Sequence, residues 1–381
     1  MSLKRRLIES GVFGLSRLAG YTRASRKRSE RPGAIFVLRN NDIGDLLVVT
    51  PLFAALRQCF PETRIIAGVG AWNLDVLKGN PHLDEVLIVN APWHNKSCGR
   101  FAHNSPRGLL DSLAYILGSP EVRAIRDRSF EIGIDVLGSP EGSLLLLKAQ
   151  IPFRLGVEGY AGGNSAAHRC VKFNPNERVG RSALQFAELL GATELPEPTP
   201  QIFLSEKEQV EGQRIWDSLA GSSMRPTRVV VGPGGGVAEK CWPLAHFVEL
   251  ATLMTTCSGC QVVIVGGRND EAAGKKISEA GAAAKNLVGR LSLRETFSLV
   301  SQADLTISNS SMLMHVAAAF KKPAVVLLGD SYPSARQHSA QWGHGSLSSV
   351  LGRESDHEKI YSASEAFQWI EAHCLSPVER H

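Results

Sequence analysis

Short apolar runs rich in β-branched residues alternate with amphipathic stretches along this chain from residue 33 onward. Alternation of this kind predicts a mostly parallel β-sheet wrapped by helices. The strands expected in the first half are Ala34–Leu38, Arg64–Val69, Glu85–Val89 and Glu131–Val136. The helices expected between them are Leu46–Cys59, Asn73–Lys78 and Arg107–Arg126, and the polar stretch 91–106 is expected to be a long loop.

A second series of the same kind follows a linker rich in proline and acid at 191–208. Its expected strands are Arg228–Gly232, Gln261–Val265, Asn286–Val288, Asp304–Ile307 and Ala324–Leu328. Its expected helices are Leu244–Thr255, Asp270–Gly281, Ser292–Ser301 and Ser311–Phe320. A chain of 381 residues is long for one core, so we predict an α/β fold with two Rossmann-like, doubly wound domains that face each other across a cleft.

The predicted domain limits divide the chain into four parts. They are a basic, amphipathic N-terminal arm (1–32), an N-terminal domain (33–200), a C-terminal domain (201–345) and a C-terminal helical tail (346–381). In such sheets, ligands bind beyond the carboxyl ends of the strands.

The N-terminal arm carries most of the positive charge. Residues 1–31 have a net charge of +7 and the whole chain +5, so the remainder sums to −2. A nearly neutral body argues against a nucleic-acid partner. As a helix, the arm presents an apolar stripe that fits an anionic membrane surface, but an arm packed on its own domain fits equally well. Seven cysteines without framework spacing suit a reducing compartment. Cys257 and Cys260 have the spacing of a redox or metal motif, but no second pair completes a site, so we expect no metal.

A glycine-rich loop follows the first strand of the second series in "VVVGPGGGVAEKCWP". Gly234, Gly235 and Gly236 let the backbone approach a ligand closely and expose N–H groups to an anion. Lys240 can neutralise a diphosphate there. The loop matches neither a P-loop nor the G-x-G-x-x-G fingerprint of a nicotinamide-dependent dehydrogenase, so we do not expect a dehydrogenase.

A run of small polar residues opens a helix in "DLTISNSSMLMHVAAAF". Capping of the helix would explain only one of these residues. The whole run, followed closely by His315, favours a phosphate-binding site at the start of the helix. We therefore predict diphosphate contacts at Ser310, Ser311, Met312 and His315. Nucleotide or sugar contacts are predicted at Gly266, Glu271, Leu291 and Asn309, although turns and caps alone could explain the loops of the first three.

The loop after the first predicted strand carries acids instead of glycines, in "LRNNDIGDLLVVTPL". Asp42 and Asp45 stand there on either side of Gly44. This composition suits an acceptor hydroxyl better than a phosphate, with Asp45 able to take a proton and Gly44 making room. We expect Asp42 to cap the helix; the alternative is that its charge raises the pKa of Asp45.

Taken together, these segments resemble the ADP-heptose:lipopolysaccharide heptosyltransferases, family 9 of the glycosyltransferases. The resemblance runs from about Ile35 to about Pro333 through "GDLLVVTPLFAALRQCFP", "NPHLDEV", "FEIGIDVLGS", "PFRLGV", "PGGGVAEKCWP", "LVGRLSL" and "SNSSMLMHVAAAF". It implies the GT-B fold, with the acceptor on the N-terminal domain and the nucleotide sugar on the C-terminal one.

The resemblance also implies an activity. Asp45 matches the family's proposed general base, Lys240 the lysine that contacts the donor diphosphate, and Asn309, Ser311 and His315 the segment that closes on the phosphates. The implied enzyme is an inverting, metal-independent glycosyltransferase without a cofactor, which moves a heptose from ADP-heptose onto a lipopolysaccharide core or a related, lipid-linked glycan. Its expected place is the cytoplasm, at the inner face of the cytoplasmic membrane.

Two residues depart from the family pattern. Ser310 stands where the family has an aspartate that touches the donor sugar, and Met312 replaces a glycine at the helix start. These departures keep two alternatives open: a related transferase with another nucleotide sugar or acceptor, and a degenerate homologue that binds nucleotide or glycan without turnover.

Overall fold

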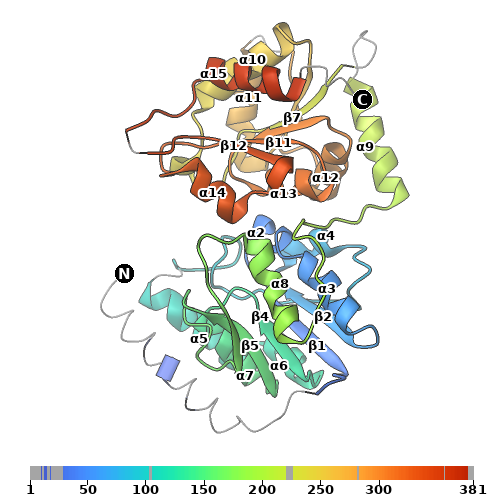
Figure 1. Ribbon diagram of the computed structural model, residues 1–381, viewed down its shortest axis with the longest axis vertical. Coiled ribbons are helices and arrows are strands. Elements are labelled where there is room, and N and C mark those ends of the chain that lie inside the picture. Colours follow the sequence, from blue (N-terminus) through green and yellow to red (C-terminus); the bar gives the residue numbers. More distant parts are fainter. Residues whose placement is uncertain are drawn as a thin grey trace. The chain divides into compact units, whose positions relative to one another are not determined.

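The computed structural model describes residues 10, 13, 14, 18, 29–102, 105–219, 226–280, 283–355 and 357–375 (Figure 1). The chain divides into two compact units, Met1–Pro198 and Thr199–His381, and each is described here by itself. Most of the predicted N-terminal arm lies outside the described residues, so its membrane contact stays a prediction. Within the described residues, no helix is long and apolar enough to cross a membrane.

The N-terminal unit is built on a six-stranded, fully parallel sheet with the order β3-β2-β1-β4-β5-β6. Its strands are β1 (Ala34–Leu38), β2 (Arg64–Val69), β3 (Glu85–Ile88), β4 (Ile132–Asp135), β5 (Phe153–Glu158) and β6 (Arg169–Lys172). The central strand β1 is buried along its whole length, as a parallel strand covered on both faces should be. The order reverses direction between β1 and β4, which makes the edge beyond these two strands the ligand-binding position of a doubly wound sheet.

Helices cover both faces of this sheet. They are α2 (Ile43–Leu47), α3 (Pro51–Cys59), η1 (Ala71–Asn73), α4 (Leu74–Leu77), α5 (Pro106–Gly118), α6 (Pro120–Asp127), α7 (Pro140–Lys148) and α8 (Val179–Leu189). One core lies between the sheet and α5, α6 and α7, whereas α3 and α8 pack against each other.

Proline explains two differences from the predicted helices. The helix expected over 46–59 is two helices, because the chain turns at 48–50 and restarts with Pro51 at the first position of α3. The helix expected over 107–126 breaks at Ser119, which caps α6 in front of Pro120. Proline lacks an N–H and favours the first turn of a helix. The strands β5 and β6 and the helices α7 and α8 were not predicted.

The C-terminal unit repeats the same design with the order β12-β11-β10-β7-β8-β9, again fully parallel. Its strands are β7 (Arg228–Gly232), β8 (Gln261–Ile264), β9 (Lys285–Asn286), β10 (Leu305–Ser308), β11 (Ala324–Leu327) and β12 (Ser348–Leu351). Counted within each unit, both sheets therefore follow the order 3-2-1-4-5-6, and the second reverses direction between β7 and β10. The predicted α/β class with two doubly wound parallel sheets is confirmed.

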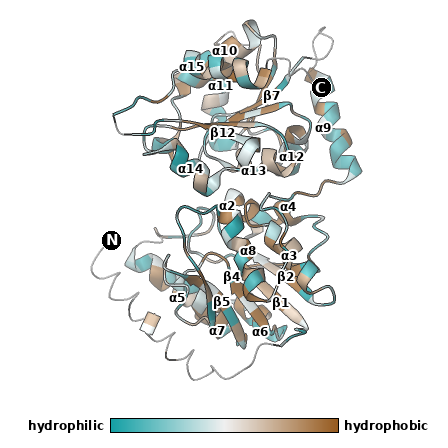
Figure 2. Ribbon diagram, viewed as in Figure 1, coloured by the Kyte–Doolittle hydropathy of each residue, from teal (hydrophilic) through white to brown (hydrophobic). Residues whose placement is uncertain are grey.

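The helices of this unit also lie on both faces of the sheet (Figure 1). They are α9 (Glu206–Leu219), η2 (Ala238–Lys240), α10 (Leu244–Thr256), η3 (Arg268–Asp270), α11 (Glu271–Glu279), α12 (Leu293–Ser301), α13 (Met312–Ala319), α14 (Ala335–Trp342), η4 (Gly345–Leu347), α15 (Ala363–Ile370) and η5 (Glu371–Leu375). Figure 2 shows α9 and α14 mostly in the hydrophilic colour, in keeping with their few buried residues.

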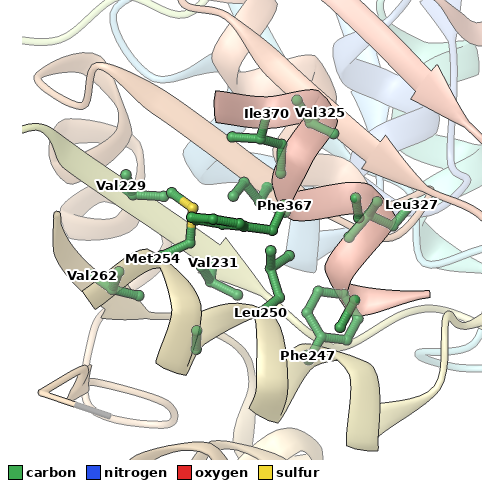
Figure 3. Packing of buried hydrophobic residues seen from close by; sticks show 14 of the residues in the cluster. Val229, Val231, Phe247, Leu250, Met254, Val262, Val325, Leu327, Phe367 and Ile370 are labelled. Carbon is green, nitrogen blue, oxygen red and sulfur yellow. The ribbon is translucent and has the colours of Figure 1, made fainter. Parts of the chain in front are cut away.

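The larger core of this unit lies under α10 and α15. Figure 3 shows Phe247, Leu250 and Met254 from α10 meeting Phe367 and Ile370 from α15 above the valines of the central strands. Full burial of such a side chain stabilises the fold by about 1.5–3 kcal/mol.

This core also corrects the prediction of a helical tail over 346–381. The segment begins with β12, which extends the sheet beside β11, and α15 then closes the core. The run Ser348–Leu351 is too short and too polar to be distinguished from a loop by its pattern alone.

Candidate functional site

The acid of the N-terminal unit lies in a helix rather than in the expected loop. Helix α2 already begins at Ile43, which places Asp45 in its first turn. The Arg39 guanidinium, directly after β1, lies 3.6 Å from the Asp45 carboxylate (Nη2 to Oδ1) and donates from Nε to the Asp45 carbonyl at 3.2 Å. The Arg39 side chain is 7% exposed and that of Asp45 30%. The carboxylate therefore keeps an open side beside a buried cation.

Several opposing influences set the proton affinity of Asp45. Burial raises the pKa of the carboxyl above its ordinary value, the positive charge of Arg39 lowers it, and the charge of Asp42 raises it again. Asp42 occupies the N-cap position of α2, but its side chain makes no capping hydrogen bond. The expectation that Asp42 caps the helix is thus wrong, and the alternative, like-charge repulsion on Asp45, is what the structure supports. Gly44 sits between the two acids within α2.

A second carboxylate, not predicted as a site residue, lies at the same reversal point of the sheet. Asp135 ends β4 and pairs in register with Leu38, the residue before Arg39. Its side chain is 2% exposed and accepts a hydrogen bond from the Ser139 N–H at 3.0 Å. Burial raises the pKa of Asp135 to about 7, opposed by backbone hydrogen bonds and by Arg39. An acid that directly follows a buried strand beside β1 was the available signal for it.

In the C-terminal unit, Asn309 joins the loops on both sides of the reversal point. Its Oδ1 accepts the backbone N–H of Trp242 at 2.8 Å, and its Nδ2 donates to the carbonyls of Pro233 (2.6 Å) and Gly234 (3.3 Å). The side chain is 1% exposed. Asn309 was predicted to contact the nucleotide or sugar, but its amide already bonds the protein, so its contribution is to hold the glycine-rich loop in place.

The glycines of the predicted site surround an acid that sequence reasoning missed. A side chain at Gly234 or at Gly266 would collide with the Asp270 carboxylate, which accepts the Gly267 N–H at 2.9 Å. A side chain at Gly235 would collide with the Cys241 sulfur. These glycines are therefore required by close packing, while Gly236 is exposed.

Glu271 and Leu291 lie beside the loops that were predicted to bind the nucleotide or sugar. Glu271 is exposed and begins α11, with its carboxylate close to Gly289. Leu291 is half-buried and precedes the α12 cap residue Ser292. Their contact with a ligand stays a prediction.

The run of small polar residues does begin a helix. Ser311 is the N-cap of α13 and accepts the N–H of Leu313 at 3.4 Å, and Met312 is the first helical residue. The free N–H groups of such a terminus attract anions. Ser310, half-buried, shares a 2.7 Å hydrogen bond with His338 of α14.

His315 lies deeper than a residue facing a ligand would. Its side chain is 5% exposed, and its Nδ1 lies 2.8 Å from Nε2 of His344. Burial, together with the charges of His344 and His338, lowers the pKa of His315 well below its ordinary value. It is therefore neutral near pH 7, and its predicted contact with the diphosphate would be that of an uncharged group.

Lys240 is an exposed cation at this edge. It ends η2, and its carbonyl accepts the Gly329 N–H at 3.3 Å, which ties the loop to the segment after β11. The ammonium lies 5.6 Å from the centre of the Tyr332 ring, within the range of a cation–π interaction. Lys240 and the N-terminus of α13 thus supply positive potential at the reversal point.

A cavity of about 920 Å³ in the same unit contains none of the predicted site residues. His246, Asp330, Glu354, Glu358, Lys359 and Glu365 are among its lining. Two of these acids already hold neighbouring loops, since Glu354 accepts from Ser334 at 2.6 Å and Glu365 from Ser362 at 2.7 Å. In the parts of the chain that the structure describes, no group of three or more His, Cys, Asp or Glu side chains could hold a metal ion; metal independence stays a prediction.

Comparison with known proteins places these features in a family. Residues 121–355 match glycosyltransferase family 9 (heptosyltransferase). The chain is 29% identical over 315 residues to lipopolysaccharide heptosyltransferase 2 of Salmonella typhimurium, covering 78% of this chain and 83% of that protein.

Solved structures share the fold. A family 9 glycosyltransferase from Veillonella parvula superposes with a TM-score of 0.71 at 19% identity, covering 91% of this chain and 99% of that one. The E. coli ADP-heptose lps heptosyltransferase II gives a TM-score of 0.67 at 23% identity, covering 90% and 98%. With more than half of the chain matched by the family, this protein is an enzyme of glycosyltransferase family 9.

Proposed function

We propose that the protein transfers a heptose from ADP-heptose to a lipopolysaccharide core or a related glycan. The family description and the names of the relatives support this donor and acceptor. The main support for the proposal is the set of charged and polar groups at the point where each sheet reverses its strand order. The N-terminal unit has a carboxylate of raised pKa there, and the C-terminal unit has a lysine and a helix N-terminus.

In this reaction Asp45 is the general base. The acceptor hydroxyl gives its proton to the Asp45 carboxylate as its oxygen attacks the anomeric carbon. The bond from that carbon to the diphosphate breaks on the opposite face, so ADP leaves and the anomeric configuration inverts. A base is most useful with a pKa near the working pH, and burial together with Asp42 moves the pKa of Asp45 in that direction.

The leaving diphosphate gains negative charge as the bond breaks. The Lys240 ammonium, the N–H groups of the 234–236 loop and the N-terminus of α13 are suited to stabilise that charge. No metal or other cofactor enters the proposed mechanism. A lipid-linked acceptor would place the enzyme at the cytoplasmic face of a membrane, where the basic arm over 1–31 could contact anionic lipid.

A panel of ADP-, UDP- and GDP-sugars with a heptose-deficient lipopolysaccharide core tests the proposal, with the products identified by mass spectrometry. We expect turnover with ADP-heptose and a loss of at least about a hundredfold in Asp45→Asn, the scale of general-base catalysis. Asp42→Asn is the matched control, since it removes a neighbouring negative charge but leaves the proposed base in place; it should lower the pKa of Asp45 and cost far less activity than Asp45→Asn. Transfer at a near wild-type rate in Asp45→Asn would show that another group is the base.

One observation favours a second donor. Ser310 offers a hydroxyl bonded to His338 rather than a carboxylate, and Met312 adds bulk at the start of α13. A transferase of the same family that uses another nucleotide sugar fits these residues, and turnover with a UDP- or GDP-sugar but not with ADP-heptose would establish it.

A further inference from the structure

His338 and Ser310 are joined although 28 residues separate them in the chain. His338 lies on α14, and Ser310 lies between β10 and α13. The His338 side chain is only 5% exposed, and its Nδ1 has no hydrogen-bond partner among the described residues. Its Nε2 lies 2.7 Å from the Ser310 hydroxyl oxygen. A buried polar ring with a single bond, directed at a residue beside the helix terminus, needs an explanation.

The direction of this hydrogen bond follows from the protonation of His338. Burial, together with the positive charge of Lys240, lowers the pKa of His338 to about 4, so the ring is neutral near pH 7 and carries one proton. A proton on Nδ1 would leave a buried N–H without an acceptor, which is costly. With the proton on Nε2, only a lone pair is unused, so we assign Nε2–H as the donor to Ser310.

Tyr332 packs beside this pair. Burial, the largest influence, raises the pKa of the Tyr332 hydroxyl above its ordinary value, although the neighbouring Ser310 side chain opposes the rise. Tyr332 therefore remains protonated at neutral pH. The His338 and Tyr332 rings pack edge to face with centres 5.2 Å apart. The Lys240 ammonium lies 5.6 Å from the centre of the Tyr332 ring.

We propose that His338 and Ser310 form a directional hydrogen-bond relay, with Tyr332 packed against it, so that the Ser310 and Tyr332 hydroxyls each donate, beside Lys240, to the diphosphate of the nucleotide donor. Ser310 and Tyr332 contact the ligand, and His338 is a positioning residue that acts through Ser310. The relay rests on the proposed donor site of the C-terminal unit. It contains donors and a nearby cation but no carboxylate, which suits an anionic ligand.

Calorimetric titration of the full chain with ADP and with adenosine tests the relay. Removing one donor to a charged ligand group in Ser310→Ala or Tyr332→Phe should weaken ADP binding by roughly tenfold to a hundredfold. Adenosine has no diphosphate, so its affinity should not change. Tyr332→Phe keeps the ring under Lys240 and removes only the hydroxyl.

Two substitutions at His338 separate positioning from packing. The amide of Gln reaches the place of Nε2, so His338→Gln should keep ADP affinity within about threefold of wild type. The shorter side chain of His338→Asn reaches only the place of Nδ1 and should lose as much affinity as Ser310→Ala. If Ser310→Ala does not fold, as judged by thermal melting, Ser310→Thr keeps the hydroxyl and should bind ADP like wild type.

The outcomes separate the relay from the function on which it rests. Wild-type protein that binds none of ADP, UDP and GDP would refute both the proposed donor site and the relay. Wild-type binding of ADP with unchanged affinity in Tyr332→Phe, Ser310→Ala and His338→Asn would refute the relay alone. An equal loss of ADP and adenosine affinity would also refute it, because the effect would then not belong to the diphosphate.

Discussion

Replacing Arg39 with glutamine should move the pH dependence of transfer, because Arg39 is the cation that restrains the pKa of Asp45. The guanidinium lies 3.6 Å from the carboxylate. At that distance the attraction is about 1 kcal/mol in water and about 4–5 kcal/mol at an effective dielectric of about 20. The Asp45 side chain is 30% exposed, so solvent screening favours the lower end, and a rise of about one pKa unit, or ~1.4 kcal/mol, is expected.

The assay is the pH profile of kcat/KM, which reports the base in the free enzyme. The acid limb of Arg39→Gln should shift about one pH unit toward alkaline pH. Arg39→Lys keeps the charge and should leave the limb near its wild-type position. Asp135→Asn is a second control, because Asp135 has a pKa of about 7 and could produce a limb of its own.

Two results would refute the reasoning. An acid limb of Arg39→Gln that superimposes on the wild-type limb would show that Arg39 does not tune the base. Loss of the limb in Asp135→Asn would assign it to Asp135 instead of Asp45. ADP affinity should be the same in all three variants, because these residues belong to the N-terminal unit.

The remaining predictions concern stability and binding. His338 has a pKa of about 4 in the folded protein and about 6.5 in the unfolded chain, so the unfolded chain binds more protons between these pH values. Urea-induced unfolding measured at several pH values should therefore show the free energy of unfolding falling by up to about 3 kcal/mol from pH 6.5 to pH 4. His338→Gln should reduce that fall. Asn309→Ala leaves the buried Trp242 N–H without its acceptor and should cost about 1–3 kcal/mol of stability and weaken ADP binding; wild-type affinity for ADP would contradict its role in holding the glycine-rich loop. Deletion of residues 1–30 should lower binding to anionic vesicles in a sedimentation assay, and unchanged binding would remove the arm from the membrane proposal.

Most of the fold could be predicted because its central strands are buried and therefore apolar in sequence. The first and last residues of β1, β2 and β7 were predicted correctly, because buried strands of a parallel sheet are continuous apolar segments rich in β-branched residues. Strands β6 and β12 were missed, since Arg169–Lys172 and Ser348–Leu351 are short edge strands with polar residues. Their pairing depends on neighbours far away in the chain, which a local pattern does not contain.

The candidate site likewise has residues that the sequence could predict and contacts that it could not. Lys240 and Ser311 could be placed because loops after buried strands meet at one edge of a parallel sheet. The contact of Arg39 with Asp45 depends on α2 starting at Ile43, earlier than the apolar pattern indicated. The bond between Ser310 and His338 joins helix α14 to the segment between β10 and α13, and only the folded chain brings these two together.

The identical strand order of the two units has a consequence for how specificity can change. Each unit has its own sheet and its own core, and the proposed donor and acceptor sites belong to different units. Mutations that alter the donor site therefore need not disturb the acceptor site. A chimaera joined between Pro198 and Thr199 should carry the donor preference of one parent and the acceptor preference of the other, so the two specificities can evolve, or be engineered, as separate modules.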